Sequence, residues 1–106
     1  MSQWTKIEKI ANPAPMDFGI STVYPIIPRG ADLGVSLGFS EFVPGSTEID
    51  VPRPECFMVT HGELEITSGG ESWTIREGEA IWMPAGSKVV ASTKAECRVI
   101  YMILLK

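Results

Sequence analysis

Residues 77–86, EGEAIWMPAG, decide the fold of this chain. Gly78 permits a backbone conformation that residues with a β-carbon rarely adopt, so it suits a tight turn. Residues 80–83 are an apolar run, short enough for a strand that is buried on both faces. Pro84 has no N–H to donate to a sheet and therefore ends that strand. The stretch predicts a short buried strand between two turns.

The rest of the chain is divided into similar short pieces by its eight prolines and ten glycines. No segment shows a helical period, and Gly69-Gly70 is a strong hairpin signal. The pattern predicts strands at residues 20–27, 33–43, 47–51, 55–60, 63–68, 71–75, 80–83, 88–92 and 97–105. We expect a single all-β sandwich or barrel over residues 19–106, preceded by an irregular N-terminal arm, residues 1–18.

Residues 33–43 alternate between two kinds of side chain. One face carries Val35, Leu37, Phe39 and Val43, and the other carries Ser36, Gly38, Ser40 and Phe42. Since apolar side chains fill small closed sheets, we expect Phe39 to help line the interior.

The last segment, residues 97–105, is apolar at eight of nine positions, with Arg98 as the exception. A strand of a small antiparallel sheet usually has one face in water, and this one has none. Its second face therefore needs a cover. A homodimer would provide one, and the N-terminal arm, with Trp4, Ile7 and Ile10, is the alternative.

The composition limits the partners of the chain. It has 9 basic and 13 acidic residues, for a net charge of −4, which argues against nucleic acid or an anionic membrane as a partner. The N-terminus lacks the apolar core of a signal peptide, and no apolar run has membrane-spanning length. We therefore expect a cytoplasmic protein. Its two cysteines, Cys56 and Cys97, are expected to be buried free thiols.

Two spacings suggest a family. Gly78, Pro84 and Gly86 form one motif, and Glu55, followed by six residues and Gly62, forms the end of another. On these motifs residues 33–105 resemble the cupin superfamily, which implies a double-stranded β-helix, or jelly-roll barrel. Residues 54–66 and 78–87 look most like the EutQ group of ethanolamine utilisation.

The resemblance to the EutQ group implies a role in ethanolamine catabolism. An acetate kinase activity has been attributed to that group, and its members tend to lack the histidine metal ligands of other cupins. No phosphate-binding loop is present in this chain, since Gly69-Gly70 opens no helix and has no lysine in the required place.

A typical cupin metal site needs three histidines and the motif glutamate. This chain has one histidine, His61, and Val89 occupies the position of the second-motif histidine. A three-histidine site is therefore impossible. We expect His61 to be a solvent-facing turn residue, and we predict no cofactor.

Carboxylates offer the one remaining route to a metal. In one register of the first motif, Glu48, Asp50 and Glu55 would form an oxygen-rich site suited to Mg²⁺, Ca²⁺ or Mn²⁺. In the other register Ile49 and Val51 point inward and the two carboxylates face water, which strand alternation favours. The possibility that the chain binds a divalent metal therefore stays open.

Glu55 is the candidate catalytic residue. Its strand continues with Cys56 and an apolar run, so burial is expected to raise the pKa of the carboxyl group and suit it to acid or base chemistry. Cys56 is expected to face the other side as a packed thiol. The candidate ligand-binding residues are Arg53, Met58, Met83, Val89 and Tyr101, with Trp82 as an alternative to Met83.

The leading hypothesis is a small cupin that binds a small polar metabolite, such as a carboxylate, an amine or an aldehyde derivative, inside the barrel. It would act as an accessory enzyme of amine or carboxylate catabolism, with Glu55 as acid or base and Tyr101 or Arg53 orienting the ligand. One alternative is a binding or sensor module without chemistry. The other is an isomerase or lyase with a carboxylate-bound metal.

Overall fold

The computed structural model describes residues 16–105 and consists almost entirely of strands. They are β1 (Met16–Phe18), β2 (Ser21–Ile27), β3 (Val35–Phe42), β4 (Gly45–Val51), β5 (Glu55–His61), β6 (Glu63–Ser68), β7 (Glu71–Arg76), β8 (Ala80–Met83), β9 (Ser87–Thr93) and β10 (Cys97–Leu104). A single 3-10 turn, η1 (Arg29–Ala31), joins β2 to β3. The all-β prediction is confirmed.

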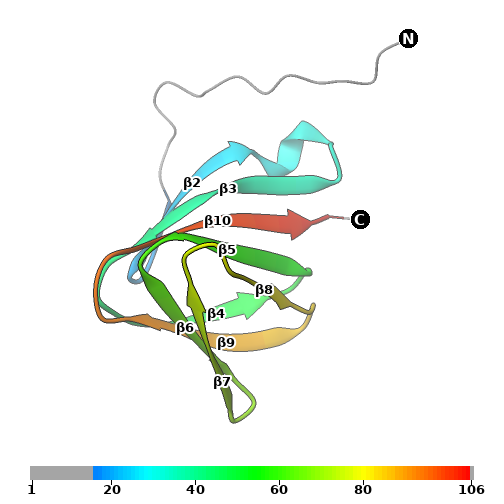
Figure 1. The fold of residues 1–106 in the computed structure, drawn as a ribbon. Coiled ribbons are helices and arrows are strands. Elements are labelled where there is room, and N and C mark those ends of the chain that lie inside the picture. Colours follow the sequence, from blue (N-terminus) through cyan, green and yellow to red (C-terminus); the bar gives the residue numbers. More distant parts are fainter. Residues whose placement is uncertain (1–15, 106) are drawn as a thin grey trace.

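The strands form two antiparallel sheets that face each other (Figure 1). A six-stranded sheet has the order β1-β2-β3-β10-β5-β8, and a four-stranded sheet has the order β4-β9-β6-β7. Some neighbouring strands are consecutive in the chain, such as β6 and β7, whereas others come from distant parts of it, as in the pairing of β10 with both β3 and β5. This arrangement is the jelly roll that the sequence motifs implied.

The four-stranded sheet follows the usual rule that apolar side chains point inward. Leu64 and Ile66 on β6, Ile75 on β7 and Ala91 on β9 are buried in the core. The residues between them along the strands are exposed, among them Glu65, which is flanked by Thr74 and Ser92. One face of this sheet is therefore dry and the other is wet.

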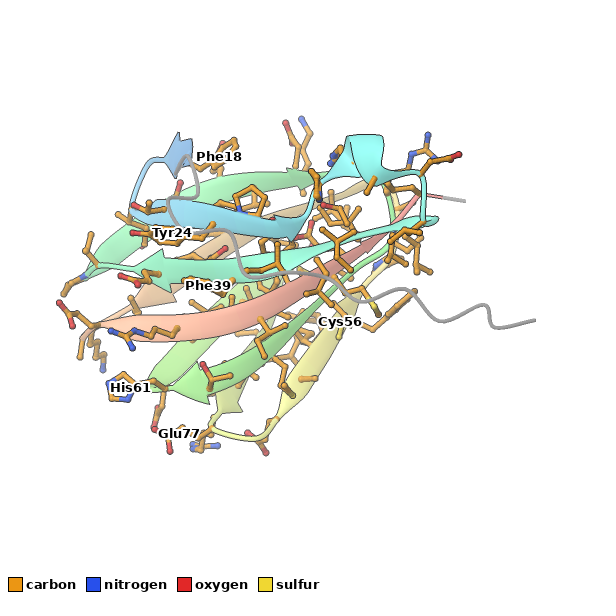
Figure 2. All side chains as sticks on the ribbon, turned by 90° about the horizontal axis from the view of Figure 1, so that it is seen from above. Phe18, Tyr24, Phe39, Cys56, His61 and Glu77 are labelled. Atoms are coloured by element: carbon orange, nitrogen blue, oxygen red, sulfur yellow. The ribbon has the colours of Figure 1, made fainter. Side chains whose placement is uncertain are left out.

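In the six-stranded sheet, β3 does not have the expected orientation. Ser36, Ser40 and Phe42 of β3 are buried, whereas Val35, Leu37 and Phe39 lie on the outer face. The ring of Phe39 stacks on that of Tyr24, with 4.8 Å between centroids, and Figure 2 shows both rings on neighbouring strands. The prediction that Phe39 lines the interior is wrong, because the small polar side chains of β3 take the inward positions.

Residues 77–86 form the expected turn, strand and turn. Gly78 has a φ of 83° and Gly86 a φ of 85°, both in the left-handed region that glycine tolerates. The strand between them, β8, is the edge of its sheet and pairs with β5 alone. Ile81 and Met83 therefore point inward while Trp82 is exposed, which corrects the expectation of burial on both faces.

The last three residues of the predicted N-terminal arm form β1, which pairs with β2. The residues proposed as a cover, Trp4, Ile7 and Ile10, lie outside the described residues. Within residues 16–105, no helix is long and apolar enough to cross a membrane.

Candidate functional site

An open cavity of about 720 Å³ lies between the two sheets, at the side where β2, β3 and β10 face β4. That volume is in the usual range for a small-ligand site. Its walls combine apolar side chains with a few polar ones. The lining includes Val23, Ile49, Phe42, Phe57 and Ile103 on the apolar side, and Arg29, Ser36, Ser40, Glu55 and Tyr101 on the polar side.

Glu55 lines this cavity from the first position of β5. Alternation along β5 turns Glu55, Phe57 and Val59 inward, with the latter two buried in the core. Burial raises the pKa of the Glu55 carboxyl to about 7, against an opposing effect of the positive charge of Arg29. Both protonation states of the carboxyl are therefore populated near neutral pH.

Tyr101 lines the same cavity from the centre of β10. It is paired with Gly38 across the strands, and a β-carbon at Gly38 would lie only 2.6 Å from the Tyr101 hydroxyl oxygen. The missing side chain therefore provides the space in which the ring lies. Burial is the main reason that the pKa of the phenol is raised, and hydrogen bonding with Ser36 opposes this effect.

Arg29 is the residue that sequence reasoning missed. It stands at the start of η1, lines the cavity, and affects the pKa of both Glu55 and Tyr101 through its charge. The available signal was its position in a Pro-Arg-Gly turn next to a predicted strand. Turns beside a barrel mouth are common places for binding residues.

The predicted arginine, Arg53, lies elsewhere. Its side chain donates a hydrogen bond from Nη1 to the carbonyl oxygen of Leu105 at 3.1 Å, in an exposed position outside the cavity lining. Arg53 therefore ties the loop before β5 to the end of the described chain.

The three apolar candidates are also placed away from the cavity. Met58 lies on the outer face of β5, because Phe57 and Val59 take the inward positions, so the prediction that it lines the interior is wrong. Met83 and Val89 are buried, but they line a second, smaller cavity of about 320 Å³ beside Trp73. Of the predicted ligand-binding set, Tyr101 alone lines the larger cavity.

The carboxylates considered as metal ligands do not form a metal site within the described residues. Glu48 and Asp50 are exposed side chains at the edge of the cavity, while Val51 is buried and Ile49 packs against the core. Residues 16–105 contain no group of three or more His, Cys, Asp or Glu side chains that could hold an ion. The second register of the first motif is therefore the one adopted, and the carboxylate metal site is not formed.

The remaining reactive side chains stand apart from the cavity. His61 is exposed at the end of β5, as expected, with Nδ1 3.8 Å from Oε1 of Glu77 (Figure 2). Cys56 is half-buried on the outer face of β5. Cys97 is fully buried, which raises the pKa of its thiol to about 11 and keeps it from acting as a nucleophile.

The cavity therefore offers one permanent cation, one carboxyl that exchanges a proton near neutral pH, two exposed carboxylates, one phenol and three serine hydroxyls. These groups stand against an apolar wall. Such a set can hold a small anion, orient it and exchange a proton with it.

Comparison with known proteins points to one family and one fold. The family model of the EutQ-like cupin domain matches residues 29–101. A sequence comparison with curated proteins finds no match.

Among solved structures, the EutQ protein of Clostridium difficile is similar, with 23% identity over 89% of this chain and 80% of that one, and a TM-score of 0.75. A putative ethanolamine utilization protein, EutQ, of Salmonella typhimurium has 20% identity over 79% and 68%, also with a TM-score of 0.75. Ectoine synthase from P. lautus has 20% identity over 85% and 67%, with a TM-score of 0.77. At these identities the structural likeness establishes the fold.

Proposed function

Because the chain belongs to the EutQ-like cupin family, we propose that it binds a small carboxylate metabolite in the cavity between its two sheets. Arg29 pairs with the carboxylate, and Glu55 exchanges a proton with the bound ligand. Two of the structural neighbours are EutQ proteins, one of them titled an ethanolamine utilization protein, which supports a role in amine or carboxylate catabolism.

The observation that carries the proposal is the convergence of Arg29, Glu55 and Tyr101 on one cavity. The positive charge of Arg29 is permanent, whereas the negative charge of Glu55 is partly lost near neutral pH because burial raises its pKa to about 7. With Glu55 protonated, the charges left in the lining are those of Arg29, Glu48 and Asp50. All three side chains are exposed, so water and salt weaken both the attraction of an anion by Arg29 and its repulsion by the two carboxylates.

Binding of an anion should also move a proton. A carboxylate that pairs with Arg29 removes the charge that lowers the pKa of Glu55, and its own charge disfavours ionised Glu55. Both effects favour the protonated carboxyl, which can then donate a hydrogen bond to the ligand. Glu55 is thereby suited to act as general acid or base at neutral pH.

Propionate is a suitable probe, since it combines one carboxylate with a short apolar body, and ethylammonium is the matched cation. We expect propionate to shift the amide NMR signals of residues around the cavity and ethylammonium to leave them unchanged. Arg29→Gln should weaken propionate binding at least ~10-fold, the loss of a charged hydrogen bond. Arg53→Gln is the matched control, because Arg53 lies outside the cavity, and it should bind propionate as the wild type does.

Proton exchange has its own measurement. Calorimetric titration of propionate in two buffers with different ionisation enthalpies should show proton uptake near pH 7 in the wild type and none in Glu55→Gln. The proposal is wrong if propionate shifts no cavity amide, or if Arg29→Gln and Arg53→Gln bind it equally well.

A further inference from the structure

Two serine hydroxyls of the cavity make no hydrogen bond within the fold. Ser21 and Ser40 line the cavity, and the two residues are only 5% and 3% exposed. Neither hydroxyl has a hydrogen-bond partner among residues 16–105, whereas Ser36, the third serine of the lining, donates to the carbonyl oxygen of Ile27 at 3.0 Å. A buried hydroxyl without a partner is unfavourable, so a pair of them in one cavity indicates that a bound group completes them.

Both unpartnered hydroxyls are open to the cavity. Among residues 16–105, every side-chain oxygen that is sealed from solvent has a hydrogen-bond partner. The hydroxyl oxygens of Ser21 and Ser40 have none, so they keep contact with solvent, and the cavity is the space that they line.

The two serines are close enough to hold one group between them. Ser40 of β3 is paired with Val23 of β2, and Ser21 lies two residues before Val23 on the same face. The serines are therefore diagonal neighbours, with their α-carbons about 7–8 Å apart. A group with an acceptor and a donor on separate atoms can bridge that gap through two hydrogen bonds of about 2.8 Å.

Strand pairing separates the two serines from the ionisable groups. Ser36 and Glu55 are both paired with Ile103, at one end of the sheet, and Tyr101 follows two residues before Ile103. Ser40 lies four residues beyond Ser36 along β3, which is about 14 Å at 3.4 Å per residue. The cavity therefore has two polar ends, one ionisable and one formed by serine hydroxyls.

The serine end contributes no charge. The cross-strand partners of Ser40 and Ser21 on the inner face are Val23 and Phe42, which are apolar. A charged group bound there would lose hydration without gaining an opposite charge from these neighbours. A carboxamide is neutral, and it carries both an acceptor oxygen and a donor nitrogen.

We propose that Ser21 and Ser40 bind a second polar group of the ligand, and that the ligand is a short linear carboxylate with a neutral, hydrogen-bonding group at its other end. The inference rests on the proposed function, which places the carboxylate at Arg29. The end group then extends across the cavity to the two serines. Ser21 and Ser40 are the residues that determine specificity for this end group.

Three ligands of equal chain length test the end group. Glutaramate ends in a carboxamide, 5-methylhexanoate has the same shape with two methyl groups in place of the amide oxygen and nitrogen, and 5-aminopentanoate ends in an ammonium. The ammonium is included because Glu48 and Asp50 line the cavity from β4. In NMR titrations we expect glutaramate to bind at least ~10-fold more tightly than either of the others, which corresponds to two hydrogen bonds. Equal or tighter binding of 5-methylhexanoate or 5-aminopentanoate would overturn the inference.

Substitution of a serine should affect one ligand and spare the others. Ser40→Ala should weaken glutaramate binding by ~5-fold and change the binding of propionate and 5-methylhexanoate by less than ~2-fold. Ser92→Ala is the matched control, because Ser92 is paired with Glu65 on the wet face of the other sheet and lies outside the cavity lining. A uniform loss for all three ligands would mean that Ser40 only shapes the cavity, and would contradict the inference.

The stability of Ser40→Ala without ligand gives a second readout. Because the hydroxyl has no partner to lose, the urea midpoint should stay the same or rise. A lower midpoint would give the hydroxyl a structural role and count against the inference.

The titrations separate this inference from the proposed function. If propionate binds and glutaramate binds no better than 5-methylhexanoate, the serine site is wrong and the carboxylate site stands. If propionate does not bind, the proposed function fails, and butanamide, which has no carboxylate, tests the serine pair by itself. Butanamide should shift the amide signals around Ser21 and Ser40 in the wild type and not in Ser40→Ala, and the absence of such shifts refutes the serine pair as a binding site.

Discussion

The two sheets of this protein both bury apolar side chains, but they differ in where they place polar ones. The four-stranded sheet buries Leu64, Ile66 and Ala91 and exposes acidic and hydroxyl side chains. The six-stranded sheet also buries apolar side chains, such as Phe57 and Val99, but it turns Ser36 and Ser40 inward and leaves Met58, Trp82 and Ile100 exposed. Both belong to one small barrel, so the difference does not come from the fold as such.

The difference bears on the proposed binding cavity. A sheet with an apolar inner face and a solvated outer face stabilises the barrel and needs no further cover. A sheet that buries polar groups pays for their desolvation unless they are hydrogen-bonded, as Ser36 is to the carbonyl oxygen of Ile27 at 3.0 Å. The six-stranded sheet lines the cavity with its inner face and exposes Met58, Trp82 and Ile100 on its outer face.

The largest expected effect comes from the dry interior of the four-stranded sheet. Leu64 is completely buried in the core, so Leu64→Ala should lower the free energy of unfolding by about 3 kcal/mol through lost burial and a residual cavity. Thr74→Ala, on the exposed face of the same sheet, should change it by less than about 0.5 kcal/mol. Urea unfolding followed by tryptophan fluorescence measures both. Similar losses would mean that the two faces do not differ as described.

A smaller effect is expected at Gly38, on the inner face of the six-stranded sheet. A β-carbon there would lie 2.5 Å from the carbonyl oxygen of Tyr24 and 2.6 Å from the Tyr101 hydroxyl, so backbone and ring would both have to move. Gly38→Ala should cost about 2 kcal/mol and displace Tyr101 from the cavity. Gly30→Ala is the control, since no atom lies within 4 Å of its added carbon. Urea unfolding gives the cost, and the near-ultraviolet circular dichroism of tyrosine reports the displacement. Gly38→Ala with wild-type stability and spectrum would contradict the packing described.

Much of the fold was accessible from the sequence because turns have local causes. Gly78, Pro84 and Gly86 predicted the turns around β8, and the hairpin at Gly69-Gly70 joins β6 to β7 where expected. Residues 63–68 were predicted as a strand with the bounds that the structure has. These features depend on backbone conformation at single residues and need no knowledge of distant contacts.

The orientation of the six-stranded sheet could not be predicted in the same way. Strand alternation defines two faces of residues 33–43 but does not say which is inside, and the rule that apolar residues point inward gave the wrong choice for Phe39 and Met58. Only the path of the chain from β2 to β3 shows that Arg29, and not Arg53, lines the cavity. For Glu55, in contrast, the position at the start of a buried strand predicted that burial would raise the pKa of the carboxyl, and the direction of the shift is confirmed.

The mildest of the three predictions concerns the charge on the inner face of the six-stranded sheet. The pKa of Glu55 is raised from 4.5 to about 7 in the folded protein, so the folded state holds the proton more tightly than the unfolded state between these values. Stability should therefore fall as pH rises from 4.5 through 7, because the buried carboxyl must ionise. Glu55→Gln removes this dependence. Part of the pKa shift is discounted for solvent exposure. The free energy of unfolding of the variant, relative to that of the wild type, should then rise by roughly 1.5 kcal/mol from pH 5 to pH 8.5. Urea unfolding at the two pH values measures it, and Glu65→Gln, on the wet face of the other sheet, serves as control. Parallel pH profiles for wild type and Glu55→Gln would show that this carboxyl is hydrated like an ordinary surface glutamate. The cavity would then have no buried group that titrates near neutral pH.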